Sequence, residues 1–501
     1  RWLPLIEDND RSRAMRAFEA CAMLSVRKGL RSGRLWIDHS FSFKDREQTL
    51  IPETEWELTR SHYASLLGLP LSAEEYLKPL VANIEAGLVS VAEARELGKL
   101  EIDEKGDLHL PALEALPDEP DARRTRDAIS TAIGAVQLPD LLLQADADVN
   151  FSETLLGRKA SSVDELIALY GGMIAHGTEN DAKGVAAMIP QLQPSQITAA
   201  MRMLEAPGRL RRANERVVEF QRTIPIAALW GQGDKASADM MALDASRHLY
   251  NARVDPRRRT FGAGIYTHVL DRYGVIYDQP IVLNERQGGA AVEGVERHNQ
   301  SGEDRVRLSL LAVDTHGYTN ATMAIAKLLG FDLCPQLRNL VERKLYVPSG
   351  TKPPDDIEAV TVAGVSLKAI AKNWDELLRL IASIRTGRLS PSMAVQRLGS
   401  AAQGEPLQRT ADQLGRLLRT LFLCDYFTNK EFRREIHTLL NRGESVHQLQ
   451  RAIYYGKIAH DRGRRTDEMK AISGSHALLT NIVMAWNTSR MQAVVDRWRK
   501  Q

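Results

Sequence analysis

The sequence predicts an α/β protein in which a mixed sheet core carries a large helical insertion and follows a mostly helical region. Two observations support this class. Apolar residues recur at helical spacing over most of residues 61–222 and again over 349–430. Between these two stretches, the chain changes character near residue 223 and becomes rich in β-forming runs. We therefore expect one sheet whose strands are contributed by the middle of the chain.

Length and composition fit an ordinary globular protein. The 501 residues correspond to about three domains of ~150 residues, and 44% of them are hydrophobic and 26% charged. A net charge of +2 says little about partners. No uninterrupted apolar stretch reaches the ~18 residues of a membrane span. The chain opens on Arg1-Trp2 without a basic and apolar leader, so we expect a fragment or a trimmed product.

Local charge and the cysteines add two observations. Three short clusters of arginine favour a solvated surface first and a nucleic-acid contact second. The clusters are Arg209, Arg211 and Arg212; Arg257, Arg258 and Arg259; and Arg462, Arg464 and Arg465. The three cysteines lie far apart, without metal-ligand spacing or a disulfide framework, which is typical of a reducing cytoplasm. They are Cys21, Cys334 and Cys424.

The part of the chain before residue 223 predicts helices with two interruptions. A helix over the first 30 residues should stop at Gly33, and "LWIDHSFSF" (35–43) alternates like a strand with Phe41 and Phe43 on its apolar face. In "LEIDEKGDLHL" the tetrapeptide "EKGD" separates two short alternating runs and predicts a hairpin. Pro207-Gly208 should divide residues 196–221 into two helices.

The core strands follow. "FGAGIYTHVL" and "GVIYDQPIVL", separated by "DRY", predict an antiparallel hairpin. The apolar run 308–313 then ends directly on Asp314. "ATMAIAKLLG" is expected to be a helix closed by Gly330, and "FDLCPQL" another strand. Hairpin strands, a strand that ends in an acid and then helices suit a ribonuclease-H-like fold, although the pattern alone does not demand it.

The remaining chain predicts helices. A loop with three prolines, "PSGTKPPDD", introduces the helical stretch 349–430. Beyond it, "EFRREIHTLL" and "ESVHQLQRAIYYGKIAH" are expected to be two helices joined at "NRG", so that Glu444 opens the second of them. The last segment, "HALLTNIVMAWNTSRMQAVVDRW", predicts a long apolar helix.

Three carboxylates are candidates for a site. A carboxylate at the end of a buried strand must be hydrated, paired or metal-bound, so Asp314 is a metal ligand or part of a turn that caps its strand. Asp239 follows a glycine-rich stretch and competes with Asp234 on local evidence, with an ordinary surface aspartate as the simpler interpretation. Glu444 in a first helical turn usually only complements the helix dipole. The residues alone leave these alternatives open.

Several motifs, in order, are similar to those of replicative transposases of the Tn3 family. The similarity runs from about residue 11 to 492 and corresponds to the C-terminal half of a family member. Its strongest pieces are "WGQGDKASADMM", "YTHVLDRYG", "DTHGYTN", "GFDLCPQLRNL", "LLNRGES" and "MAWNT". Earlier pieces are "WIDHSFSF", "LPDLLLQAD", "AHGTEN" and "TIPIAALWG", the first of them a loose match.

The resemblance implies an acidic triad at Asp239, Asp314 and Glu444 that is both catalytic and metal-binding. It also implies a ribonuclease-H-like mixed sheet and four regions. These are 1–222, a mostly helical scaffold for dimerisation and DNA contact; 223–348, the first part of the core; 349–430, the helical insertion; and 431–501, the closing helices of the catalytic core. The sequence departs from the family at Gln232, Ala238, Met240 and Leu311-Ala312-Val313.

The implied chemistry is metal-dependent transfer of phosphodiesters. Three carboxylates can hold two divalent ions about 3.5–4 Å apart, and oxygen ligands suit Mg²⁺ or Mn²⁺ rather than zinc. The resemblance implies 3′-end cleavage at the transposon termini and strand transfer into target DNA, giving a cointegrate. The expected partners are the terminal inverted repeats, target DNA and a second copy of the chain, in the bacterial cytoplasm at the nucleoid.

This interpretation also includes expectations for four other residues. Arg451 and Lys457 would face DNA phosphates or be solvated, and His268 and His316 would be structural rather than acid/base groups. Two rival functions remain: a ribonuclease-H-like endonuclease that cuts without joining, and a non-catalytic derivative that bridges DNA.

Overall fold

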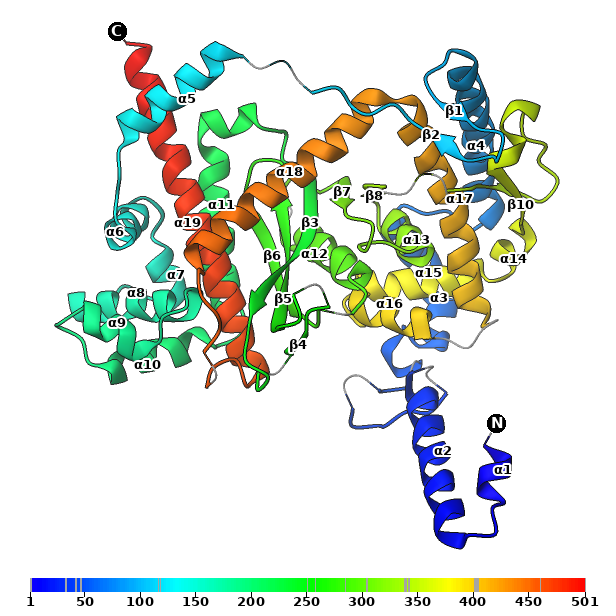
Figure 1. Cartoon of the computed structure of the whole chain (residues 1–501), viewed down its shortest axis with the longest axis horizontal. Helices are drawn as coiled ribbons and strands as arrows, with labels where there is room; N and C mark the ends of the chain where they lie inside the picture. Colours follow the sequence, from blue (N-terminus) through cyan, green and yellow to red (C-terminus); the bar gives the residue numbers. More distant parts are fainter. Residues whose placement is uncertain are drawn as a thin grey trace. The chain divides into compact units, whose positions relative to one another are not determined.

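The computed structural model shows a mixed α/β protein with two compact units (Figure 1). Unit 1 comprises Arg1–Pro111, Tyr318–Leu333 and Arg338–Lys430, and unit 2 comprises Ala112–Gly317, Cys334–Leu337 and Glu431–Gln501. Within these ranges the structure describes residues 2–31, 34–40, 43–45, 47–115, 117, 119–249, 251–256, 258–283, 285–302, 305–337, 340, 343–400, 405–459 and 461–500.

Unit 1 is mostly helical. Its elements are α1 (Leu3–Ile6), α2 (Arg11–Arg31), η1 (Glu47–Thr49), α3 (Glu53–Leu67), α4 (Ala73–Glu96), β1 (Glu101–Ile102), β2 (Leu108–His109), α13 (Asn320–Leu328), β9 (Leu345–Pro348), η3 (Asp355–Val360), β10 (Thr361–Val365), α14 (Leu367–Lys372), α15 (Trp374–Arg385), α16 (Pro391–Ser400) and α17 (Pro406–Thr428). α17 packs against α4, α13 and β9 and buries Leu414, Leu417 and Leu423. The predicted hairpin is confirmed as the antiparallel pair β1–β2.

A glycine in α17 allows the closest helix contact in this packing. A Cβ added at Gly415 would overlap the carbonyl group of Asn320 and lie 2.8 Å from its Cα, because the first turn of α13 touches α17 there. Backbone atoms cannot turn aside as a flexible side chain does. The contact therefore requires glycine even though glycine costs a helix interior ~1 kcal/mol relative to alanine.

We expect Gly415→Ala to lower the free energy of unfolding by about 3 kcal/mol, because α13 and α17 must separate to admit the methyl group. Gly399→Ala in α16 is the matched control. Among the described residues, and apart from its chain neighbours and the nearby backbone of its own helix, no atom lies within 4 Å of the Cβ that it would add, so it should be neutral or stabilising by up to ~1 kcal/mol. Urea unfolding of both variants measures the difference, and equal stabilities would contradict the close approach.

Unit 2 contains the sheet. Its elements are α5 (Pro120–Ile133), α6 (Leu138–Val149), α7 (Phe151–Leu156), α8 (Val163–Gly177), α9 (Ala182–Met188), α10 (Pro194–Leu204), α11 (Arg209–Thr223), η2 (Pro225–Leu229), β3 (Lys235–Asp244), β4 (Arg253–Val254), β5 (Phe261–Leu270), β6 (Val275–Ile281), α12 (Gly288–Gln300), β7 (Leu310–Val313), α18 (Lys430–Ile453) and α19 (Thr466–Trp498). β8 (Asp332–Pro335) completes the sheet, and its last two residues belong to unit 2. Pro207-Gly208 separates α10 from α11, as predicted.

The sheet is mixed, with strand order β4-β5-β3-β7-β8 and β6 also paired with β5. β5 is antiparallel to both β3 and β6, which confirms the predicted hairpin, and β7 is parallel to β3. Parallel neighbours need a crossover connection, and here α12 lies between β6 and β7 in the chain. β7 ends at Val313, so Asp314 follows the buried strand directly, as predicted.

Helices cover both faces of the sheet. Because side chains alternate along a strand, Ser237, Asp239 and Met241 share one face, while Ala238 and Met240 share the other. On the first face, Val446 of α18 and Ala477 of α19 belong to the same buried apolar cluster as Val269 and Val275 of β5 and β6. On the second face α12 packs so closely that Gly294 touches the ring of His268. Asp239 therefore points to the side that α18 and α19 cover.

Two predicted elements are wrong. Residues 34–40 form bends and turns rather than a strand, and the positions 41 and 42 of that segment and the predicted stop at Gly33 lie outside the described residues. "NRG" does not divide two helices, because α18 runs unbroken from Lys430 to Ile453 and Glu444 lies inside it. Gly443 faces Ser237 of β3 within that helix, and a Cβ there would lie 2.8 Å from Ser237 Oγ. The glycine serves the contact with the sheet rather than a helix end.

Among the described residues, no single helix has the length and apolarity needed to cross a membrane. The bent pair α5 and α6 meets the criteria of length and composition when the two are taken together.

Candidate metal centre

Asp239 lies in the middle of the sheet, on the face covered by α18. It is partly buried, and its register partner across the antiparallel ladder is Thr267 of β5. The backbone N–H of Met240 donates a hydrogen bond of 2.7 Å to Asp239 Oδ1. The side chain therefore starts from a well-packed strand, which gives it a defined position.

Three contacts attach α18 to the first residues of β3 and to the residue after the end of β5, close to this aspartate. Lys235, at the start of β3, forms an ion pair with Glu435 of α18. Arg442 donates a hydrogen bond of 2.6 Å to the backbone carbonyl of Asp271, and Gly443 lies against Ser237. Glu444 is the next residue after this close approach. The position of its side chain is thus determined by the docking of the helix and not by a helix end.

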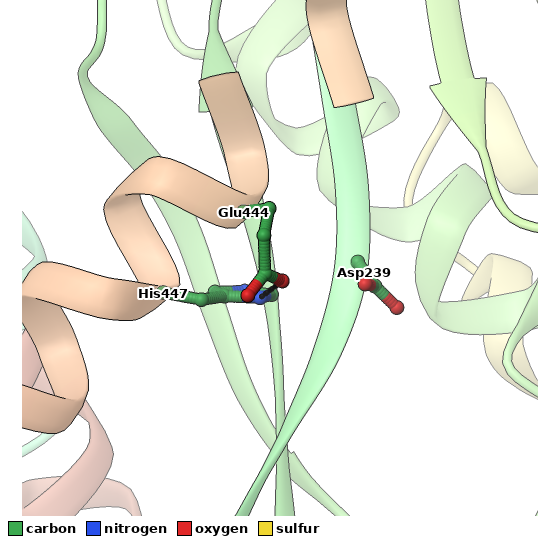
Figure 2. Close-up of side chains that lie close together, drawn as sticks. All are labelled: Asp239, Glu444 and His447. Atoms are coloured by element: carbon green, nitrogen blue, oxygen red, sulfur yellow. Dashed lines mark ion pairs between the residues drawn. The ribbon is translucent and has the colours of Figure 1, made fainter. Parts of the chain in front are cut away.

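A histidine joins the two acids. Asp239, Glu444 and His447 each offer one ligand atom, and these three atoms lie within 4.8 Å of one another. Figure 2 shows Glu444 and His447 extending from α18 toward Asp239 on its strand. His447 Nδ1 is 3.9 Å from Glu444 Oε2, and its Nε2 shares a hydrogen bond of 2.8 Å with Thr267 Oγ1. The histidine side chain is 2% exposed, whereas that of Glu444 is 49% exposed.

Reasoning from the sequence missed His447. The available signal was the spacing Glu444-x-x-His447, which places both side chains on one face of a helix. That spacing does not indicate a site when Glu444 is expected in the first turn of its helix, because an acid there usually only complements the helix dipole. It becomes informative only once α18 is known to be continuous through this region.

Asp314 lies next to this group but is not one of its three members. Ala238 pairs with Val313 in the parallel register of β3 and β7, so Asp239 and Asp314 occupy successive corresponding positions on neighbouring strands. The backbone N–H of His316 donates a 2.9 Å hydrogen bond to Asp314 Oδ1. The negative charge of Asp314 nevertheless contributes to raising the pKa of Asp239.

The two acids of the group have opposite electrostatic environments. Burial raises the pKa of Asp239, and the charges of Asp314 and Glu444 act in the same direction, while His447 and the Met240 N–H oppose them. The interaction with His447, and then the hydrogen bond from Arg451, lowers the pKa of Glu444 to about 2. Asp239 is thus a carboxylate that lacks sufficient cationic compensation. A divalent cation bound among these oxygen and nitrogen atoms would supply it, so the donor set fits such an ion.

The other candidate residues from the sequence are not members of the group formed by Asp239, Glu444 and His447. Asp234 precedes β3, where Ser309 Oγ donates to its carboxylate at 3.2 Å. His268 is buried and bonded to the carbonyl of Ala291 at 2.8 Å, as expected for a structural residue. Arg451 donates to Glu444 Oε1 at 2.9 Å, so in this state its guanidinium holds the acid. The proposed contact of Arg451 and Lys457 with DNA phosphates stays a prediction.

We expect cation affinity to fall in acid because of Asp239. A raised pKa means that this carboxyl keeps its proton to a higher pH, and a cation must displace that proton. Glu444, with a pKa of about 2, is ionised over the whole range of interest. The affinity for Mn²⁺ should therefore decrease as the pH falls through the raised pKa of Asp239. Calorimetry at a series of pH values measures this, and an unchanged affinity down to pH ~4, the ordinary carboxyl pKa, would contradict it.

Comparison with known proteins gives a consistent result. Residues 140–501 match the family model described as the Tn3 transposase DDE domain. The chain is 47% identical over 498 residues to the transposase for insertion sequence element IS1071 in transposon Tn5271 of Comamonas testosteroni, covering 99% of this chain and 50% of that protein.

Two more distant relatives cover the chain to the same extent. The transposase for transposon Tn501 of Pseudomonas aeruginosa is 28% identical, covering 97% of this chain and 49% of that protein. The transposase for transposon gamma-delta of Escherichia coli is 25% identical, covering 100% of this chain and 50% of that protein. The chain thus spans about half the length of the curated relatives that it matches.

Proposed function

Because the chain belongs to the Tn3 family of transposases and carries the family's DDE domain, we propose that it catalyses 3′-end cleavage at transposon ends and joins those ends to target DNA. The product of this replicative route is a cointegrate. The observation that carries the proposal is the convergence of Asp239 and Glu444, from segments 205 positions apart in the numbering, beside the strand end that bears Asp314.

We assign the catalytic and metal-binding roles to Asp239, Asp314 and Glu444. Asp239 is partly buried on the central strand, which is paired with β5 on one side and β7 on the other. Asp314 directly follows β7, the parallel neighbour of that strand. Glu444 is half-exposed on α18 and is held by Arg451 and His447. Two acids on rigid strands and one on a docked helix would orient a scissile phosphate beside them.

The strand order supports a ribonuclease-H-like core. A hairpin of β5 and β6 leads away from β3 on one side, and β7 and β8 follow on its other side, with β3 and β7 parallel. Asp239 then lies on the central strand, Asp314 directly after the adjacent parallel strand, and the glutamate on a later helix. We propose that residues 349–430 are an insertion between the parts of this core, and that 223–348 and 431–501 build it.

The proposed cofactor is Mg²⁺ or Mn²⁺, two ions for each site. Asp239, Asp314 and Glu444 would hold them through carboxylate oxygens, the ligands that hard divalent cations prefer. A bound cation of this kind polarises a phosphoryl oxygen and lowers the pKa of a coordinated water. The three carboxylates would supply the negative charge that binds the cations. Their places on the sheet and on α18 would determine where the cations lie.

The proposed partners are double-stranded DNA, as terminal inverted repeats and target, and a second copy of this chain. Two ends must be cut and joined in a concerted way, which a homodimer on DNA would allow. Such a substrate implies work at the bacterial nucleoid, and residues 1–222 are the proposed region for dimerisation and DNA contact.

The decisive experiment supplies the purified protein with Mg²⁺ and DNA that carries the element's own termini. The expected result is nicking at the 3′ ends and, with precleaved ends, covalent joining to a plasmid target. Cleavage without joining would replace the proposal with an endonuclease. DNA binding without cleavage or joining, whichever divalent ion is added, would replace the proposal with a non-catalytic bridging protein.

A further inference from the structure

We propose that His447 is a direct ligand of a divalent cation at this site, through Nδ1, so that the centre is a mixed carboxylate–imidazole site. The inference rests on the proposed function, which places a cation at the three acids, and it adds a nitrogen donor to them. It further predicts which ions the site prefers.

The orientation of the His447 ring favours ligation through Nδ1. The His447 side chain is 2% exposed, so its two nitrogens need partners inside the protein. Nε2 has one in Thr267 Oγ1 at 2.8 Å. When the ring proton resides on Nε2 and is donated to that hydroxyl, Nδ1 presents a lone pair toward Glu444 and Asp239. A ligating histidine in proteins nearly always donates its other ring N–H to a second group in this manner.

The distances between the donor atoms are close to those of a metal site. Ligand atoms that bind one small divalent ion at ~2.1 Å lie at most ~4.2 Å from one another. His447 Nδ1 and Glu444 Oε2 already satisfy this at 3.9 Å, and all three donors, including one from Asp239, lie within 4.8 Å. A contraction of roughly half an ångström would complete the coordination, which side-chain rotation provides. Figure 2 shows the imidazole of His447 beside the Glu444 carboxylate, with Asp239 across from them on its strand.

The strands of the sheet help to position the histidine. Thr267, which orients the ring, is the register partner of Asp239 on the neighbouring strand. One pair of cross-strand residues thus supplies both a ligand and the group that orients another ligand. Gly443 brings the helix close enough to Ser237, two residues before Asp239 on β3, for His447 to reach across.

A nitrogen donor changes the ion preference. Imidazole favours Mn²⁺, Co²⁺ and Ni²⁺ over Mg²⁺, because affinity for a nitrogen-containing site rises along the Irving–Williams order whereas Mg²⁺ prefers oxygen. We therefore expect the chain to bind Mn²⁺ more tightly than Mg²⁺. His447→Asn places an amide oxygen at the position of Nδ1. It should raise the Kd for Mn²⁺ about tenfold and change the Kd for Mg²⁺ less.

The experiment is pulsed electron paramagnetic resonance of Mn²⁺ bound to the full chain. A coordinated imidazole produces a ¹⁴N modulation that a carboxylate cannot produce. We expect this modulation in the wild-type protein, its conversion to the ¹⁵N pattern after labelling with ¹⁵N-histidine, and its loss in His447→Asn. The labelling needs no substitution, so the test survives if the variant folds poorly.

His316→Asn is the matched control, because His316 adjoins Asp314 and is exposed. It should keep the modulation. Mn²⁺ that binds in an Asp239-dependent manner without nitrogen coupling would overturn the role of His447 and leave the proposed function intact. In that case His447 serves only as a hydrogen-bond donor to Glu444. Loss of the modulation in His316→Asn rather than His447→Asn would also overturn it. Mn²⁺ that does not bind at all would instead contradict the three-acid site itself.

Discussion

Asp314→Asn is expected to abolish both end cleavage and strand transfer while the affinity for DNA stays unchanged. The substitution keeps the size of the side chain and the acceptor for the His316 N–H, so the turn after β7 is preserved. It removes one of the three negative charges that would hold the cations. Loss of several kcal/mol of transition-state stabilisation corresponds to a fall of at least about a hundredfold in rate. Gel-based cleavage and joining assays, with an electrophoretic shift in parallel, measure both properties.

Asp332→Asn is a suitable control for this change. Asp332 opens β8, next to β7 in the sheet, and its exposed carboxylate pairs with Lys327. An exposed ion pair contributes little, so we expect normal activity. If Asp314→Asn still nicked transposon ends at the wild-type rate, Asp314 would have no catalytic role and the triad would need another member.

Asp239→Asn should stabilise the cation-free protein and remove its response to Mn²⁺. The pKa of Asp239 is raised in the folded chain by burial and by the neighbouring acids. A carboxyl whose pKa is higher in the folded than in the unfolded chain stabilises the fold fully at pH values below its pKa in the unfolded chain. This stabilisation is lost as the pH rises through its pKa in the folded chain. At neutral pH the Asp239 carboxylate therefore destabilises the fold, and a neutral amide relieves that cost. We expect a Tm that is ~2 °C or more higher in the presence of a chelator.

The wild-type protein should gain stability with Mn²⁺, by about 2.7 kcal/mol at a hundred times Kd, whereas Asp239→Asn should gain little. Asp244→Asn, at the other end of β3, is the control. It removes an exposed pair with Arg258 of 2.8 Å and should leave the Mn²⁺ effect in place. Differential scanning calorimetry of the three proteins, with and without Mn²⁺, measures these changes in Tm. A lower Tm for Asp239→Asn in chelator would show that the carboxylate is stabilising and that its environment is misassigned.

Much of the secondary structure follows from local patterns. The β5–β6 hairpin, the strand that ends before Asp314, the break at Pro207-Gly208 and the long helix α19 were all predictable, because turn residues and apolar periodicity act over short distances. The two wrong elements have different causes. Residues 35–39 are exposed, so their apolar alternation buries no face and does not produce a strand. The glycine of "NRG" looks like a helix end locally, but it lies inside α18 where the helix contacts Ser237 of the sheet.

The sequence by itself determined the family, the mixed α/β class and the three candidate acids, since these depend on residue types, their order and their approximate spacing. Only the tertiary structure decided which side chains meet. It placed Asp239 on the sheet face that α18 covers, kept α18 continuous through Gly443, and so brought Glu444 and His447 to the same point. The physical reason is that a ligand group is a set of distances between segments far apart in the chain. Those distances arise from the register of strands and the close approach of a helix, which no local pattern encodes.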